Sequence, residues 1–343
     1  MLSLQEFTHR ELIVEVGNRV KKVLITGITG QDGHHLSQLL IEKEYEVYGL
    51  LNGQRNSRVE EFRKSFPQVQ LIGGDLGDFS SLHSVVQKIE PDEIYNLGAI
   101  SFVGLSFQQP ELTSNITGLG TLRLLEAVRK CGFESKTRIY QASSSEMFGK
   151  VRETPQNELT PFHPRSPYGV AKTFAHYMCQ NYREAYNMHV SSGILFNHEG
   201  EFRGHEFVTR KITSNLAKIK LGKISKFSLG DIEPKRDWGY AGDYVYAMWL
   251  MLQQETPEDY VIATGETHSV REFLEVAIKE SGLTGHISDY VEFDQNLIRP
   301  SEVDLLIGDA TKAKEKLGWE PKVKFGELVH IMMRNDLEIE SKQ

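Results

Sequence analysis

The stretch QASSSEMFGKVRETPQNELTPFHPRSPYGVAK (141–172) carries several side chains that could take part in proton and hydride transfer. Tyr168 and Lys172 are four residues apart, so on a helix they lie on the same face. A lysine ammonium close to a phenol favours the phenolate, and a phenolate can take a proton from a hydroxyl group. Ser144 and Glu146 precede this pair, and a simple hydride-transferring enzyme does not need the extra carboxylate. The stretch therefore indicates oxidoreductase chemistry and leaves the role of Glu146 to be explained.

A glycine-rich stretch, TGITGQDG (26–33), has the spacing G-x-x-G-x-x-G. It follows an apolar run and precedes a helical pattern, which is the context that a dinucleotide-binding loop requires. Glycine lets the backbone come close to a pyrophosphate, whose charge is stabilised at a helix N-terminus. We expect this loop to bind a dinucleotide through Gly27, Thr29, Gly30, Gln31, Asp32 and Gly33.

The second predicted strand ends without the acidic residue that binds the adenosine ribose of NAD. The following residues, LLNGQRNSR (50–58), contain two arginines and no carboxylate. An arginine at this place favours a 2′-phosphate and hence NADP, with Arg55 as the first candidate and Arg58 as the second. The alternative is a solvated basic loop.

These side chains must be positioned by alternating strands and helices. Apolar runs predict strands at 21–27, 46–51, 69–75, 92–99, 137–143, 189–197 and 259–265. Helical patterns occupy 34–45, 121–132, Pro167 to Tyr186, 206–222, 269–282 and 309–321. We predict an α/β fold with a Rossmann-type doubly wound parallel sheet and a smaller C-terminal α/β lobe for the substrate. The expected division is an extension at 1–20, a Rossmann domain at 21–198 with returns near 236–265, and a lobe formed mainly by 199–343.

The composition of the 343 residues excludes several classes of protein. A net charge of -8 argues against a general nucleic-acid binder. Cys131 and Cys179 have no metal-like spacing and suit a reducing compartment, so we expect no metal site. No apolar run approaches the roughly 20 residues of a membrane helix. The glutamates in the first 20 residues do not suit a signal or transit peptide, so we expect a cytoplasmic protein.

Further stretches extend the pattern along the chain. They include Asp75-Leu76, EIYNLGA, GTLRLLEAVR, YQASSSEMFGKV, PRSPYGVAK, GILFNHE, FVTRKI, KRDWG, DYVYAMWLMLQ, RPSEVD and GDATKAKEKLGW. Together with the glycine loop they resemble the GDP-mannose 4,6-dehydratase family, a branch of the extended short-chain dehydrogenases/reductases. The resemblance runs from about residue 21 to about residue 335.

This resemblance implies a role for each reactive residue. Tyr168 would take the proton of the hexose C4 hydroxyl while hydride passes from C4 to NADP. Lys172 would lower the pKa of Tyr168 and hold the nicotinamide ribose. Glu146 would remove the C5 proton, and Glu146 or Ser144 would protonate the C6 hydroxyl as it leaves as water. Hydride would then return to C6, giving GDP-4-keto-6-deoxy-mannose.

The resemblance also implies binding residues. For the cofactor these are Asp75, Leu76, Leu97, Gly98, Ala99, Tyr168, Lys172, His198 and Arg203. For the GDP-sugar substrate they are Ser101, Asn197, Lys211, Arg236, Arg299 and Glu302. Two stretches depart from the family. GEFRG (200–204) stands where the family has S-P-R-R-G, so only Arg203 is carried over, and Asn52-Gly53 replaces an arginine pair, which makes a homodimer better supported than a homotetramer.

Three alternatives remain at this point. The same chemistry could act on another GDP sugar, such as a GDP-manno-heptose. A sugar-nucleotide epimerase or reductase would share the fold, although it would not need Glu146 beside Ser144. A non-catalytic NADP-binding protein is the third, and the intact Tyr168 and Lys172 argue against it.

Overall fold

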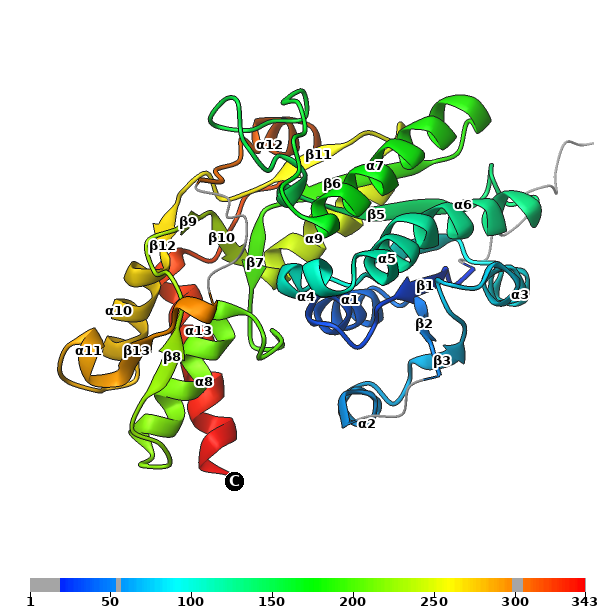
Figure 1. Cartoon of the computed structure of the whole chain (residues 1–343). Coiled ribbons are helices and arrows are strands. Elements are labelled where there is room, and N and C mark those ends of the chain that lie inside the picture. Colours follow the sequence, from blue (N-terminus) through cyan, green and yellow to red (C-terminus); the bar gives the residue numbers. More distant parts are fainter. Residues whose placement is uncertain (1–18, 54–56, 298–304, 343) are drawn as a thin grey trace, which may run out of the picture.

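A seven-stranded parallel sheet forms the centre of the molecule (Figure 1). The structure, a computed structural model, describes residues 19–53, 57–297 and 305–342. The strand order is β11-β6-β5-β4-β1-β2-β3, and every neighbouring pair is parallel. The bounds are β1 Lys22–Thr26, β2 Glu46–Leu51, β3 Gln70–Gly73, β4 Glu93–Asn96, β5 Arg138–Ser144, β6 Val190–Leu195 and β11 Tyr260–Ile262. The predicted fold class is confirmed.

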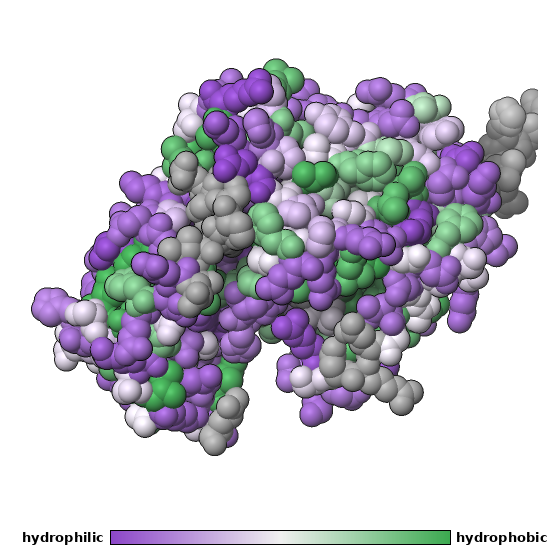
Figure 2. Space-filling model, in the orientation of Figure 1, coloured by the Kyte–Doolittle hydropathy of each residue, from purple (hydrophilic) through white to green (hydrophobic). Residues whose placement is uncertain are grey.

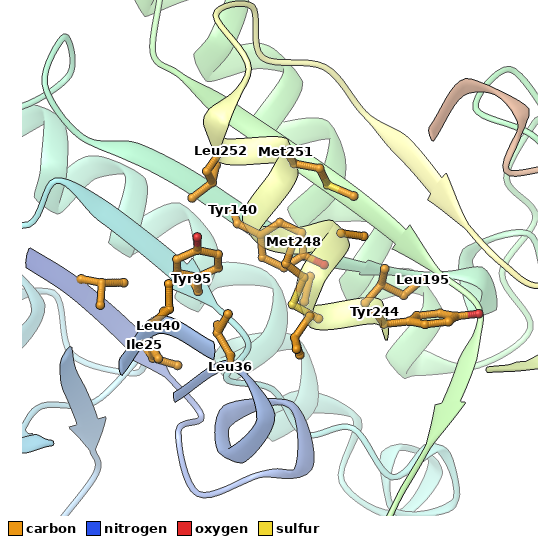
Figure 3. Close-up of a cluster of buried hydrophobic side chains, with 14 of the residues drawn as sticks. Ile25, Leu36, Leu40, Tyr95, Tyr140, Leu195, Tyr244, Met248, Met251 and Leu252 are labelled. Atoms are coloured by element: carbon orange, nitrogen blue, oxygen red, sulfur yellow. The ribbon is translucent and has the colours of Figure 1, made fainter. Parts of the chain in front are cut away.

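Helices cover both faces of this sheet because successive strand side chains point to opposite sides. Val23 and Ile25 of β1 pack with α1 (Gln31–Glu42) and α9 (Ala241–Gln253), whereas Leu24 packs with α3 (Phe79–Ile89), α6 (Gly120–Lys130) and α7 (Pro167–Tyr186). Figure 3 shows the first of these clusters, in which Leu36 and Met248 lie beneath the aromatic rings of the sheet. Because most of these strands are covered on both faces, the sequence shows continuous apolar runs rather than alternation.

A second group of helices and short strands lies beside the sheet (Figure 1), and it encloses its own apolar core. It is formed by α8 (Val208–Lys220), α10 (Val270–Glu280) and α13 (Phe325–Ser341), together with β8 (Phe227–Leu229) and β13 (Val291–Phe293). A capping box starts α10, because Ser269 accepts from the Glu272 backbone while the Glu272 carboxylate accepts from the Ser269 backbone. Between α8 and α13 the chain returns to the sheet through α9, β11 and α12 (Thr311–Leu317).

The predicted elements lie close to their predicted places, but many further elements in both halves of the chain were not predicted. The helix at Pro167–Tyr186 and the strand at Glu46–Leu51 have the predicted bounds. The predicted strand at 92–99 is shorter, because the chain leaves the sheet after Asn96. Unpredicted elements are α2 (Ser57–Ser65), α3, α4 (Val103–Gln108), α5 (Pro110–Thr113), the π-helix η1 (Ser114–Leu119), η2 (Ser145–Met147), β7 (Asn197–Glu199), β8, β9 (Lys235–Arg236), β10 (Trp238–Tyr240), α9, β12 (His268–Ser269), α11 (Ile287–Tyr290), β13, η3 (Gln295–Leu297) and α13.

Two further findings concern the described residues. Cys131 and Cys179 are both free thiols. None of the helices described is both long and apolar enough to cross a membrane. The expected extension at 1–20 lies almost entirely outside the described residues, which begin at Arg19.

Candidate active site

A cavity of about 510 Å³ lies at the carboxyl ends of β1, β4, β5 and β6. The order of the strands reverses at β1, whose neighbours are β2 on one side and β4 on the other. Ligands of open α/β sheets bind at such a switch point, outside the carboxyl ends of the strands. The cavity is therefore where this fold is expected to bind a ligand.

All four predicted catalytic residues line the cavity. Ser144 ends β5, and its Oγ accepts a hydrogen bond of 3.2 Å from the backbone N–H of Glu146 in the following 3-10 turn. Tyr168 and Lys172 lie in the first turns of α7, which Ser166 caps by accepting from the Gly169 backbone at 3.0 Å.

The start of α7 is packed tightly against the turn that carries Glu146. A Cβ atom at Gly169 would lie 2.7 Å from the backbone oxygen of Glu146, a separation that non-bonded atoms do not tolerate. Glycine at this position thus lets the helix approach, and the approach places Tyr168 beside the Ser144–Glu146 turn. The loop and the helix form one unit, although Ser144 and Tyr168 lie far apart in the sequence.

Burial dominates the ionisation of the tyrosine and lysine. It raises the pKa of Tyr168 to about 12, against the effect of a hydrogen bond from Ser144 and with a further increase from the Glu146 charge. Burial also lowers the pKa of Lys172 to about 8. The Lys172 ammonium donates to the backbone oxygen of Ala142 at 2.6 Å and lies 5.7 Å from the centre of the Tyr168 ring. The expectation for Tyr168 considered the positive charge of Lys172 but left out the cost of burying a phenolate, which raises the tyrosine pKa here.

The glycine loop has the geometry that a pyrophosphate needs. Gly27 has φ +68°, and a Cβ there would lie 2.9 Å from the Gly98 backbone. A Cβ at Gly33 would lie 2.1 Å from the oxygen of Ile28. Gly30 is the N-cap of α1 and offers no side-chain cap, so the first-turn N–H groups are left for an anion. These features fit the pyrophosphate of a dinucleotide.

Asp32 and His198 form an ion pair on the wall of the cavity, with Oδ2 and Nε2 2.9 Å apart. The Nδ1 atom of His198 lies 2.8 Å from the backbone oxygen of Phe196. Since both partners are acceptors, both ring nitrogens must donate and the ring is an imidazolium. Burial alone would lower the pKa of His198, but the Asp32 charge and both hydrogen bonds raise it above its usual value. The same pair holds the pKa of Asp32 at about 2 despite its burial.

The structure brings together most of the predicted binding residues but not all. The lining includes Gly27, Thr29, Gly30, Gln31, Asp32, Gly33, Leu97, Ala99, Ser101, Asn197, His198 and Arg203. Gly98 and Leu76 lie just behind it, where a Cβ at Gly98 would meet the Leu76 side chain at 2.7 Å. Asp75 is used locally, because its carboxylate accepts from the Gly77 backbone at 2.6 Å.

The predicted nucleotide-binding residues are not gathered in this cavity. Lys211 lies on α8 and Arg236 on β9, and neither belongs to the lining. Arg55, Arg299 and Glu302 lie outside the described residues. Arg203 lines the cavity, but its Nε atom lies 2.9 Å from a Glu199 carboxylate oxygen and its guanidinium stacks 3.5 Å from the centre of the Phe207 ring.

Sequence reasoning missed a group of lining residues contributed by the stretch at 200–207 and by α13. Phe202 stacks on His34 of α1 with ring centroids 4.6 Å apart, and Arg58 pairs with Glu206 at 3.5 Å. The buried Arg210 donates to Asp336 of α13 at 2.7 Å. The departure at 200–204 was a usable signal for the first contact, since Phe202 stands where the family has an arginine. No local signal links residues 210 and 336.

The chain matches the family model described as GDP-mannose 4,6 dehydratase over residues 24–332. A GDP-mannose 4,6 dehydratase of Dictyostelium discoideum is 51% identical over 344 residues, which cover 93% of this chain and 96% of the relative. The Homo sapiens enzyme of the same name is 49% identical over 349 residues, covering 95% of this chain and 94% of the relative. Among solved structures, the UDP-glucose 4-epimerase of Thermus thermophilus in complex with NAD is 27% identical and has a TM-score of 0.79, covering 92% of this chain and 98% of that one. The chain belongs to the GDP-mannose 4,6-dehydratase family.

Proposed function

We propose that this protein dehydrates GDP-mannose to GDP-4-keto-6-deoxy-mannose with NADP as a bound cofactor that ends each cycle as it began. The observation that carries the proposal is the placement of Glu146 and Ser144 in one cavity with Tyr168 and Lys172. An epimerase or reductase needs only Tyr168 and Lys172. Removal of a C5 proton and a C6 hydroxyl also needs an acid–base group, which Glu146 with Ser144 would supply. Membership of the dehydratase family supports the same reaction.

When bound, the nicotinamide accepts hydride from C4 and returns it to C6. The protein's own residues move the protons. Tyr168 takes the proton of the C4 hydroxyl, with Ser144 hydrogen-bonded to its phenol and the Lys172 ammonium as the nearby positive charge. Once C4 is a ketone, the C5 proton is acidic and the Glu146 carboxylate removes it. Glu146 then protonates the departing C6 hydroxyl, or Ser144 does so at the same edge of the cavity. As C6 receives hydride, Tyr168 gives the proton that it took from the C4 hydroxyl to C5, which restores the phenolate.

The choice of NADP over NAD rests on the end of β2. After Leu51 the chain continues with Asn52, so the acidic residue that would bind the free ribose hydroxyls of NAD is missing. Arg58 lines the cavity from α2 and could pair with a 2′-phosphate, as its present partner is the half-exposed carboxylate of Glu206. An exposed pair of this kind is weak and easily exchanged for a phosphate.

A second copy of the chain is the partner that we propose for the outer face of α7. Val170, Phe174 and Tyr177 are 55%, 40% and 52% exposed, and Leu119 of the neighbouring η1 is 41% exposed. Figure 2 shows apolar side chains gathered on this face of the molecule. Contiguous apolar surface of this kind marks an interaction site.

The function is tested by mass analysis of the nucleotide sugar. Incubation of the protein with GDP-mannose should produce a species lighter by one water. Loss of water from a GDP-heptose but not from GDP-mannose would move the assignment to that substrate, and loss from neither would overturn it.

Glu146→Gln tests the role of the acid. We expect the variant to retain hydride transfer to the cofactor, seen as NADPH absorbance, while water loss falls by at least roughly 100-fold because its base is gone. Glu184→Gln is the matched control, since Glu184 is exposed on the far part of α7. Water loss at the parental rate in Glu146→Gln would show that another group removes the C5 proton.

A further inference from the structure

A row of buried and half-buried polar side chains runs along the inner face of α7. Lys172, His176, Gln180 and Arg183 follow one another at spacings of four, four and three residues, so they lie on one side of the helix. His176 is 2% exposed. The proposed reaction uses only Lys172, which leaves the rest of the row without a function.

At its far end the row is fixed by Asp259, just before β11. Arg183 donates to both oxygens of this carboxylate, at 3.0 and 2.8 Å, and the Ser192 backbone donates to it at 3.2 Å. Burial alone would raise the pKa of Asp259, but the hydrogen bonds and charge of Arg183 hold it below its usual value. The carboxylate is therefore only an acceptor. Since the Gln180 side chain approaches it at 2.8 Å, the approaching atom must be the amide nitrogen Nε2.

This fixed amide determines the hydrogen on the histidine. The same Nε2 atom of Gln180 lies 3.1 Å from Nε2 of His176. An amide nitrogen donates, so the His176 Nε2 atom must present its lone pair. Burial lowers the pKa of His176, and the neutral ring carries its one hydrogen on Nδ1. Nδ1 lies 3.0 Å from the hydroxyl of Ser143, to which it donates.

The row thus ends at a serine that lines the cavity. Ser143 is the last but one residue of β5, next to Ser144. Its oxygen accepts from His176, and within residues 19–53, 57–297 and 305–342 its hydroxyl has no other hydrogen-bond partner. The hydroxyl hydrogen is therefore left to donate. Lys172 fixes the preceding residue in the same way, through its 2.6 Å bond to the Ala142 oxygen.

We infer that Ser143 is a further ligand-binding residue of the active site, and that His176 is a positioning residue that makes its hydroxyl a donor toward the cavity. The ligand atom is an acceptor oxygen at the reacting end of the site. It belongs either to the nicotinamide carboxamide or to the hexose. The inference rests on the proposed function only for the identity of these two ligands. It is tested by the affinity for each ligand and not by the rate of the reaction.

Ser143→Ala removes the donor with little change of volume. We expect it to weaken one ligand roughly tenfold, as the loss of one well-placed hydrogen bond does. The two measurements are NADPH titration by fluorescence and GDP-mannose titration by calorimetry on the NADPH-loaded full chain, in which the oxidation at C4 cannot start. A lower affinity for NADPH would show that Ser143 binds the nicotinamide carboxamide. A lower affinity for GDP-mannose would show that it binds the hexose. Ser191→Ala is the matched control, because Ser191 is a fully buried β6 serine whose hydroxyl has no hydrogen-bond partner among the described residues. Unchanged affinity for both ligands in Ser143→Ala would overturn the inference.

Two substitutions of His176 separate positioning from packing. His176→Phe keeps a ring but cannot donate, so it should reproduce the loss seen in Ser143→Ala. His176→Gln retains an amide donor and should recover most of the affinity. A role in packing alone predicts the opposite order, since a ring fills the space better than an amide. Combining Ser143→Ala with His176→Phe should add no further loss. Additive losses would refute the link between the two residues, and if the Phe variant fails to fold, parental affinity in Ser143→Ala remains the refuting outcome.

Discussion

Replacing Asp32 by Asn removes the charge from the buried pair with His198. The Asp32 side chain is 21% exposed, so solvent screens the pair only in part. Its pKa falls from an ordinary value of 3.8 to about 2. At 1.36 kcal/mol per pKa unit, this difference corresponds to roughly 2.5 kcal/mol of stability at neutral pH. We expect Asp32→Asn to lower the free energy of unfolding by about 2 to 3 kcal/mol, since the amide cannot compensate the imidazolium.

The loss of unfolding free energy in Asp32→Asn should depend on pH, because both Asp32 and His198 titrate. Asp32 has a lowered pKa, so its contribution is present above pH 3.8 and is lost as the pH falls toward about 2. His198 has a raised pKa, so its contribution is present below 6.5 and is lost as the pH rises through its pKa in the folded protein. The gap between the parent and Asp32→Asn is therefore widest between about pH 4 and pH 6.5. The gap should become smaller above this pH range, because a neutral His198 carries only one ring hydrogen and cannot donate from both nitrogens.

Urea unfolding of both proteins at about pH 5.5 and about pH 8.5 measures this gap. Glu42→Gln is the matched control, because Glu42 ends the same helix and contacts Gln38 only as a hydrogen-bond acceptor. The control should change the free energy of unfolding by less than about 0.5 kcal/mol. A gap of the same size at both pH values, or one below about 0.5 kcal/mol at the lower pH, would refute the reasoning.

Three further changes test other parts of the argument. Arg58→Ala should weaken NADP about tenfold and leave NAD unchanged in fluorescence titrations, because only NADP offers a 2′-phosphate; equal weakening would remove Arg58 from the phosphate site. Phe174→Glu should shift the protein to monomers in sedimentation velocity, because a charge cannot be buried in an apolar contact; an unchanged assembly would exclude that face. Gly33→Ala should destabilise the fold by roughly 1 to 3 kcal/mol in urea unfolding although alanine favours helices, because its Cβ would lie 2.1 Å from the Ile28 oxygen. Gly326→Ala is the control, because a Cβ there has open space, and it should instead raise the free energy of unfolding by up to about 1 kcal/mol. A change of the same sign in both variants would contradict the clash at Gly33.

Local patterns were sufficient to predict the sheet and to select four candidate reactive residues that line one cavity. The buried strands are continuous apolar runs, and the helix at Pro167–Tyr186 has its serine cap, its proline and its periodicity within one segment. The reactive residues lie at the carboxyl ends of strands or at the starts of helices, where parallel sheets bring such groups together. Ser144 and Tyr168 therefore lie in one cavity, as their positions in the alternating pattern indicated.

The features of the site that the sequence did not predict depend on contacts between residues that are distant in sequence. Asp32 meets His198 across 166 positions, and Arg210 meets Asp336 across 126. Neither spacing follows from a local pattern, and α13 itself was not predicted. The rise of the Tyr168 pKa by burial was missed for a related reason. A neighbouring charge is visible in sequence, whereas the burial that outweighs it is a property of the folded chain.

The helix α7 explains why the proposed catalytic residues and the proposed contact between copies belong together. Helices at the surface of a sheet usually turn their apolar stripe inward. Here the inner face carries Lys172, His176, Gln180 and Arg183 among small buried residues, while Phe174 and Tyr177 point outward. The polar row is fixed at the far end by the Asp259 carboxylate and at the near end by β5, so its hydrogen bonds set the rotation of the helix. That rotation places Tyr168 in the cavity, and it also turns the large apolar side chains toward solvent. The exposed patch is then a consequence of the way in which α7 is held, and a second copy covering it would stabilise the same rotation.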